Sequence, residues 1–187
     1  ISACEKGGQW QRALALLDEM RAARVTPDVI TFSAAISACA RASQPDQAMR
    51  LWSEVRTSSS LVPDIVAFNA ILDAVVCWPH KACELWKLGL ECGVYSVNYP
   101  YLHRTAGRTT CVLDLHHLSE GAAEAAIRWL FDEKLSRCNS GLSLAVISPD
   151  DTPVDRVQLI TGWGRSRKVT SHGDVRARAI ATLDHLG

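Results

Sequence analysis

An internal repeat of 35 to 36 residues constrains the fold of this chain more than any other feature of its sequence. Three short segments recur in nearly one register: Ile1-Ser2-Ala3-Cys4 as Ile36-Ser37-Ala38-Cys39, Pro27-Asp28-Val29 as Pro63-Asp64-Ile65, and Phe32-Ser33-Ala34 as Phe68-Asn69-Ala70. Three matches in one register are hard to attribute to chance, and a period of this length is typical of stacked helix pairs. The sequence therefore predicts an α-solenoid over its first half.

Each repeat carries the apolar spacing of two amphipathic helices, at i, i+3, i+4 and i+7. The second repeat shows it at Phe32, Ala35, Ile36 and Cys39, and again at Ala48, Leu51, Trp52 and Val55. The third shows it at Phe68, Ile71, Leu72 and Val75, then at Ala82, Leu85 and Trp86. The first keeps its second helix, with Ala13, Leu16, Leu17 and Met20. Asp28 and Asp64 precede new helices and are expected to cap them.

A helix pair that opens with Val-Ile-Thr-Phe-Ser and closes on Pro-Asp resembles the pentatricopeptide repeat, over residues 1–97. Tetratricopeptide repeats are the nearest competitor, but their period and signature differ. The resemblance implies binding of single-stranded RNA, with one base read per repeat by the fifth and last residues. For the repeat 29–64 these are Ser33 and Asp64, a pair that resembles the family's guanine-favouring combination. Asn69 opens the next pair, and Asp28 closes the first.

The residues alone leave other roles open for this segment. Asp28 and Asp64 could be helix caps and nothing more, and Ser33 could be a solvated helix position. The concave face of a helical array suits protein as well as RNA. Residues 1–97 carry nine Lys or Arg against ten Asp or Glu, so charge does not favour RNA. The family resemblance is what favours RNA as the partner.

The second half changes pattern. Residues 98–110 show no apolar period and are predicted to be a linker. A strand at Val112–His116 then places Asp114 and His116 on one face, with Leu113 and Leu115 on the other. Later elements follow in order: a helix capped by Ser119 with Ala123, Ala126, Ile127 and Leu130 on one side, a short strand or loop segment at Leu144–Ile147, a strand at Val157–Ile160, and a helix with Val175, Ala179, Ile180 and Leu183. This order predicts a small α/β sandwich over 111–187.

Leu113-Asp114-Leu115-His116 followed by Thr161-Gly162-Trp163-Gly164 resembles the small MutS-related (Smr) domain. The whole chain then resembles the organellar proteins that combine pentatricopeptide repeats with an Smr domain, which implies an intracellular protein of the chloroplast or mitochondrion. Two features depart from the family. His117 stands where bacterial members usually have glycine, and the chain stops at Gly187, before the strands that normally finish the domain.

The second Smr-like motif has a physical interpretation of its own. Gly162 and Gly164 allow backbone amides to approach an anion closely. Five cations lie between residues 162 and 178 against one acid, Asp174; they are Arg165, Arg167, Lys168, Arg176 and Arg178. Trp163 could stack on a base. We expect Thr161, Gly162, Trp163, Gly164, Arg165, Arg167 and Lys168 to bind RNA, the alternative being a tight turn with a core tryptophan and a solvated basic helix face.

Asp114 and His116 are the candidate catalytic pair of an endoribonuclease. A histidine can take a proton from a water or a ribose hydroxyl, and Asp114 could orient that imidazole or hold a divalent ion such as magnesium. In the alternative, Asp114 hydrogen-bonds the neighbouring loop and His116 only contacts nucleic acid. The runner-up function is a non-catalytic scaffold that binds protein through its repeats and nucleic acid through its second half. DNA is a third possible substrate, since Smr domains elsewhere nick DNA.

Composition excludes several classes. Twenty Lys or Arg balance 20 Asp or Glu, which excludes a uniformly basic binder, and no apolar run approaches the length of a membrane helix. Seven scattered cysteines indicate buried reduced thiols rather than a disulfide framework. Cys77, His80 and Cys83 lack a fourth ligand, so no metal site is predicted there. Because Ile1 falls inside a helical pattern, the sequence is expected to be a fragment.

Overall fold

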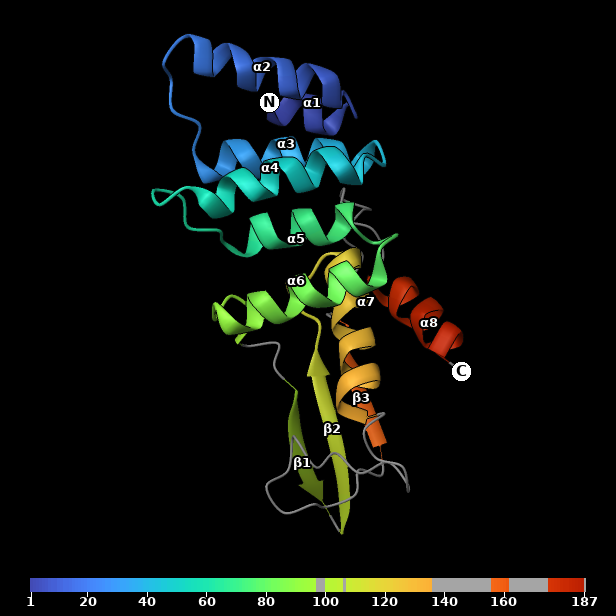
Figure 1. Ribbon diagram of the computed structural model, residues 1–187. Helices are drawn as coiled ribbons and strands as arrows, with labels where there is room; N and C mark the ends of the chain where they lie inside the picture. The colour runs from blue at the N-terminus through green and yellow to red at the C-terminus, as the bar shows by residue number, and fades with distance from the viewer. Residues whose placement is uncertain (97–99, 106, 136–155, 162–174, 187) are drawn as a thin grey trace. The chain divides into compact units, whose positions relative to one another are not determined.

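Figure 1 shows a computed structural model of the chain, which describes residues 1–96, 100–105, 107–135, 156–161 and 175–186. The chain forms two compact units, Ile1–Leu85 and Trp86–Gly187. In the part that the structure describes, no helix is both long and apolar enough to cross a membrane. The strand or loop segment predicted at Leu144–Ile147 and the features predicted at residues 162–174 lie outside the described residues.

The first unit consists of stacked helix pairs (Figure 1). Its helices are α1 (Ser2–Lys6), α2 (Trp10–Ala22), α3 (Val29–Arg41), α4 (Pro45–Thr57) and α5 (Ile65–Ala74), followed by α6 (Pro79–Glu91), in which the unit ends. α3 packs against α4 and α5, so the first helices of consecutive repeats are neighbours. The predicted apolar faces of the second and third repeats are buried, and Trp52 meets Phe68 edge-on, with ring centroids 4.8 Å apart. The helical repeats predicted from the period are therefore confirmed.

The starts of α3 and α5 repeat the same cap. Asp28 Oδ1 accepts hydrogen bonds from the Thr31 amide at 2.7 Å and the Thr31 hydroxyl at 2.6 Å. Asp64 Oδ1 accepts from the Ala67 amide at 2.9 Å. The hydrogen bonds from Thr31 hold the pKa of Asp28 below its ordinary value. Both aspartates therefore stabilise helix starts by satisfying amides that have no partner within the helix.

The second unit is a sheet with helices. β1 (Tyr101–Thr105) pairs antiparallel with β2 (Arg108–Asp114), and β2 pairs parallel with β3 (Arg156–Ile160), in the order β1-β2-β3. α7 (Glu120–Trp129) runs into a π-helical segment at Leu130–Leu135, and α8 (Val175–Leu186) follows β3. The linker predicted at 98–110 is wrong where the structure describes it, because β1 and the start of β2 lie there. Four of the five β1 side chains are exposed, which removes the apolar alternation that would have revealed the strand.

Alternation divides the sheet into a core face and an open face. Thr109, Cys111 and Leu113 are buried on the core face, with Leu102, Val157 and Leu159 opposite them in the neighbouring strands. Burial raises the pKa of the Cys111 thiol to about 11. Residues 108, 110, 112 and 114 point to the other face, which bears mostly polar side chains. On this second face Arg108 is exposed, Thr110 and Asp114 are half-buried and Val112 is buried, so the face is only partly open to solvent.

Helix α7 follows the prediction closely and α8 does not. Ser119 caps α7 by accepting from the Ala122 amide at 3.3 Å, and the four predicted core residues, three in α7 and Leu130 at the start of the π-helical segment, are buried. In α8, Ala179 is buried, but Ile180 and Leu183 are 52% and 37% exposed, so the predicted apolar face is wrong there. The buried side of α8 instead includes Thr182, because α8 packs on α7 through a polar network.

Candidate nucleic-acid interface

The repeat residues predicted to read bases lie at the starts of the first helices. Asp28 and Asp64 are exposed, and each cap uses only Oδ1. Ser33 is 4% exposed, and its hydroxyl donates to the Val29 carbonyl oxygen at 2.7 Å, so it is not the solvated position allowed as an alternative. Asn69 occupies the equivalent place in α5 and is partly buried. The cap role of both aspartates is confirmed by this geometry.

Two apolar side chains that the sequence analysis passed over stand beside these caps. Ile30 is 68% exposed and Val66 is 58% exposed, although large aliphatic side chains usually bury. They are 36 residues apart, at the second position of α3 and of α5, so they occupy equivalent places in consecutive repeats. Recurrence of an apolar residue outside the core period, beside the Pro-Asp of each repeat, is the signal that could have identified them.

In the second unit, Asp114 and His116 are in direct contact. Asp114 Oδ1 lies 2.6 Å from His116 Nδ1 and accepts from the His116 amide at 2.8 Å. The prediction that both residues lie on one strand is wrong, since β2 ends at Asp114 and His116 belongs to the following turn. The turn folds the imidazole back onto the carboxylate, so the pair forms by a different route. The amide contact also matches the alternative in which Asp114 binds the neighbouring loop.

The turn after β2 explains one departure from the Smr pattern. His117 has φ +65°, in the left-handed region that favours glycine, and the Leu118 amide donates to the Leu115 carbonyl oxygen at 3.3 Å. A glycine would therefore suit this position. Thr161 follows β3, which is parallel to β2, so it lies toward the same end of the sheet as Asp114. The remaining predicted contacts, Gly162, Trp163, Gly164, Arg165, Arg167 and Lys168, lie outside the described residues.

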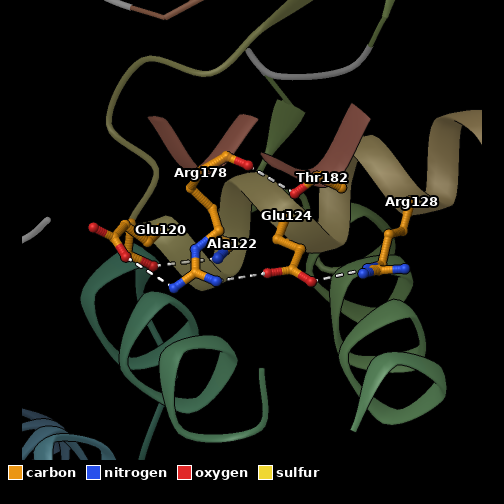
Figure 2. A network of polar contacts seen from close by, with 7 residues as sticks. Glu120, Ala122, Glu124, Arg128, Arg178 and Thr182 are labelled. Carbon is orange, nitrogen blue, oxygen red and sulfur yellow. Dashed lines mark hydrogen bonds and ion pairs between the residues drawn. The ribbon is translucent and has the colours of Figure 1, made fainter. Parts of the chain in front are cut away.

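Arg178, which the sequence placed in a phosphate-binding cluster, is engaged by α7 instead. Figure 2 shows its guanidinium reaching from α8 to two carboxylates of α7. Its Nη2 lies 3.2 Å from Glu120 Oε2 and its Nη1 lies 3.4 Å from Glu124 Oε2. Arg128 Nε binds the other oxygen of Glu124 at 2.9 Å. Because Glu124 is buried, these arginines serve to neutralise it, and the predicted phosphate-binding cluster loses Arg178.

The cysteines only partly follow the prediction of buried thiols. Cys4, Cys39 and Cys111 are buried, but Cys77 and Cys92 are exposed, and all of these are free. Among the described residues, no group of three or more His, Cys, Asp or Glu side chains could hold a metal ion. Cys77 and His80 instead line an open depression of about 730 Å³ with residues of α4 and of the start of α6.

Comparison with known proteins identifies the repeats. The PPR repeat family matches residues 1–41, and the PPR repeat matches residues 30–59. Three pentatricopeptide repeat-containing proteins of Arabidopsis thaliana are similar to the chain. The first is 30% identical over 114 residues, which is 58% of this chain and 12% of that protein. The second is 33% identical over 73 residues, which is 39% of this chain and 11% of that protein. The third is 27% identical over 125 residues, which is 64% of this chain and 13% of that protein.

The chain thus spans about one eighth of the length of the curated relatives that it matches. The matched residues, 1–59, contain the helix pairs and the Asp28 cap described above. Sequence period, helix pairing and repeat match agree, and residues 1–59 are therefore similar to pentatricopeptide repeats.

Proposed function

We propose that this chain binds single-stranded RNA with sequence selectivity through its repeats, in a chloroplast or mitochondrion. Pentatricopeptide repeat proteins are in general sequence-specific RNA binders, and their plant members are typically organellar. Because the chain spans a small part of its relatives, its own repeats would contribute a few nucleotides to a longer site.

One observation carries the proposal: exposed apolar side chains recur beside exposed carboxylates at the starts of α3 and α5. The exposed side chains of Ile30 and Val66 can pack against the flat, apolar faces of a nucleobase, whose edges carry hydrogen-bonding groups. Asp28 and Asp64 stand two residues before them and use one oxygen for the cap. A base held between the aliphatic side chains would therefore have a carboxylate oxygen near its edge.

Ser33 and Asp64 are the proposed reading pair of the second repeat. Asp64 can accept from the donors on a guanine edge, which suits the guanine preference that the family resemblance implies. The Ser33 hydroxyl donates to Val29 and retains lone pairs as an acceptor. Asn69 is the proposed first member of the next pair, and Asp28 the last member of the preceding one.

In vitro selection from a random RNA pool tests this assignment. In a protein that carries the whole array, Ser33→Asn should move the preference at one nucleotide from guanine toward a pyrimidine. Asp64→Asn is the matched variant for the partner residue, because asparagine keeps the cap while the carboxylate is lost. Thermal denaturation controls for the fold, since Ser33 is buried. Identical selected sequences for parent and both variants would contradict the reading pair.

A second candidate function is RNA cleavage by an Smr-like second unit. The contact of Asp114 with His116 favours it, because a carboxylate on Nδ1 fixes the orientation of the imidazole. His116 would take a proton from a water or from a ribose 2′-hydroxyl, whose oxygen then attacks phosphorus as the bond to the leaving oxygen breaks. A carboxylate oxygen of Asp114 suits magnesium, although among the residues that the structure describes no group of three or more His, Cys, Asp or Glu side chains could hold a metal ion.

Cleavage is tested with the full-length protein and labelled RNA, with and without magnesium. His116→Ala should abolish cutting and leave binding within about three-fold of the parent, as expected for a proton-transfer residue. RNA with a 2′-deoxy linkage separates the routes, because attack by the ribose hydroxyl needs that oxygen. A variant that cuts as fast as the parent would exclude His116. If neither the parent nor the variant cuts RNA, the alternative function is a non-catalytic scaffold. Such a scaffold would bind protein through its repeats or nucleic acid through its second unit.

A further inference from the structure

The open face of the sheet gathers side chains from three segments that are distant in the sequence. Directly opposed residues of neighbouring strands share a face, so the register gives the composition of this one. Its rungs are Thr105 with Arg108, then His103, Thr110 and Arg156, then Tyr101, Val112 and Gln158. Asp114, opposite Ile160, ends the series. We call this set the sheet platform.

The platform combines exposed cations with one exposed aromatic ring. Tyr101 is 52% exposed, and the guanidinium-bearing Arg108 and Arg156 and the imidazole of His103 are exposed as well, whereas Val112, opposite Tyr101, is buried. The sequence from Tyr95 to Leu113 contains no Asp or Glu, and β3 contains none either. Within the described strands, the acid on this face is Asp114, at the far end from the β1–β2 turn. The platform is therefore locally positive in a chain of zero net charge.

The arginines of the platform differ from those of the helices in the same unit. Arg128 and Arg178 neutralise Glu120 and Glu124, and the first of these arginines is largely covered. By contrast, no ion pair is formed by Arg108 or by Arg156 with any residue that the structure describes. Their guanidinium groups are thus placed to bind an anionic ligand rather than a structural carboxylate.

We propose that the sheet platform binds a single strand of RNA, with a base stacked on Tyr101 and phosphates bound by Arg108 and Arg156. An exposed aromatic ring beside exposed cations suits single-stranded nucleic acid of any sequence, because the ring can stack on a base while the cations bind phosphates. A strand lying along β2 would lead from Arg108 to Asp114, and so to the Asp114–His116 pair. The inference rests on the proposed function in taking RNA as the ligand, but it concerns residues outside the repeats.

The test measures anisotropy of labelled oligouridine RNA bound to the full chain across a salt series. Arg108→Ala with Arg156→Ala should weaken binding about 10-fold and reduce the salt slope by about 1.4, because two phosphate contacts are lost. Tyr101→Ala should weaken binding about five-fold or more through loss of stacking, and Tyr101→Phe should restore it. Arg12→Ala with Arg56→Ala makes the same charge change on exposed positions of α2 and α4 and should have little effect.

Variants of the repeats separate this inference from the proposed function. Ile30→Ser with Val66→Ser should weaken binding independently of the platform. If the repeat variant loses affinity and the platform variants match the parent, the platform is wrong and the proposed function stands. If only the platform variants lose affinity, the platform stands and the proposed role of the repeats is wrong. If the parent protein binds no RNA, both the proposed function and RNA binding by the platform are contradicted. If the platform variants bind RNA like the parent and lose only the binding of a protein partner, RNA binding by the platform is contradicted.

Discussion

The repeat unit and the sheet unit place their polar side chains in different ways. In the repeats, Asp28 and Asp64 take the same cap position 36 residues apart, each followed two residues later by an exposed aliphatic side chain. In the sheet unit, Tyr101, Arg108 and Arg156 reach one face only through strand register. A periodic unit therefore displays its binding residues as a pattern in the sequence, whereas a sheet assembles them from segments that share no pattern.

Both units have apolar cores, and truncating a core side chain of the repeats gives the largest expected effect. Trp52→Ala should lower the free energy of unfolding by about 3–5 kcal/mol, because it leaves a cavity against Phe68. Urea denaturation followed by circular dichroism measures the loss. Val62→Ala, at a position 80% exposed, is the control and should change stability little. Equal losses for the two variants would show that the stacked helices do not depend on this contact.

The sheet unit adds a polar network between α7 and α8 to its apolar packing. Arg178→Ala should lower the free energy of unfolding by about 1–3 kcal/mol, because Glu120 and the buried Glu124 lose a charged partner. Arg178→Lys should recover part of that loss, since lysine keeps the charge without the forked geometry. Thermal denaturation compares them. If Arg178→Ala leaves stability unchanged but weakens RNA binding, the arginine serves the phosphate role that the sequence first suggested.

The structure of the repeats could be predicted from the sequence more fully than that of the sheet unit. The helices of the repeats were predicted because their core residues lie within one or two turns of each other, at spacings that the sequence displays. β1 was missed because it is an edge strand whose side chains are mostly exposed, so its partner strand, not its own composition, makes it a strand. The face of α8 was missed because Arg178 and Thr182 turn toward α7 and leave Ile180 in solvent.

The candidate sites divide likewise. The proximity of Asp114 and His116 was predicted from a spacing of two residues, although a turn rather than a strand brings them together. Ile30 and Val66 were not predicted as site residues because their side chains are apolar and cannot hydrogen-bond to a base. Arg156 and Arg108 lie on the same face of the sheet because of the parallel register of β2 and β3, which no local feature of the sequence reveals.

A smaller effect is expected at the turn that joins β2 to α7. His117→Gly should raise the free energy of unfolding by about 0.5–1 kcal/mol, because glycine adopts the left-handed φ of +65° without steric cost. The gain is reduced by the greater freedom of glycine in the unfolded chain. His117→Ala is the matched control, since alanine removes the imidazole and keeps the strain. A gain of the same size for alanine would mean that the imidazole, and not the backbone, is what costs stability.

The smallest expected effect tests whether the two caps of the repeats are equivalent. Thr31 gives Asp28 a hydroxyl hydrogen bond in addition to the amide, whereas Ala67, at the same place in the next repeat, has only its amide to offer. The pKa of Asp28 is lowered from 3.8, chiefly by that hydroxyl. A carboxyl whose pKa is lower in the folded state stabilises the fold above the unfolded pKa, and the contribution disappears as pH falls through the folded value.

The stability difference between parent and Asp28→Asn should therefore be constant near neutral pH and shrink below about pH 3.8. Thr31→Val should make that pH dependence weaker, because the hydroxyl is lost and the amide remains. Chemical denaturation from pH 7 to pH 3 measures both, and a difference that does not change with pH would show that the charge of Asp28 adds nothing to its cap.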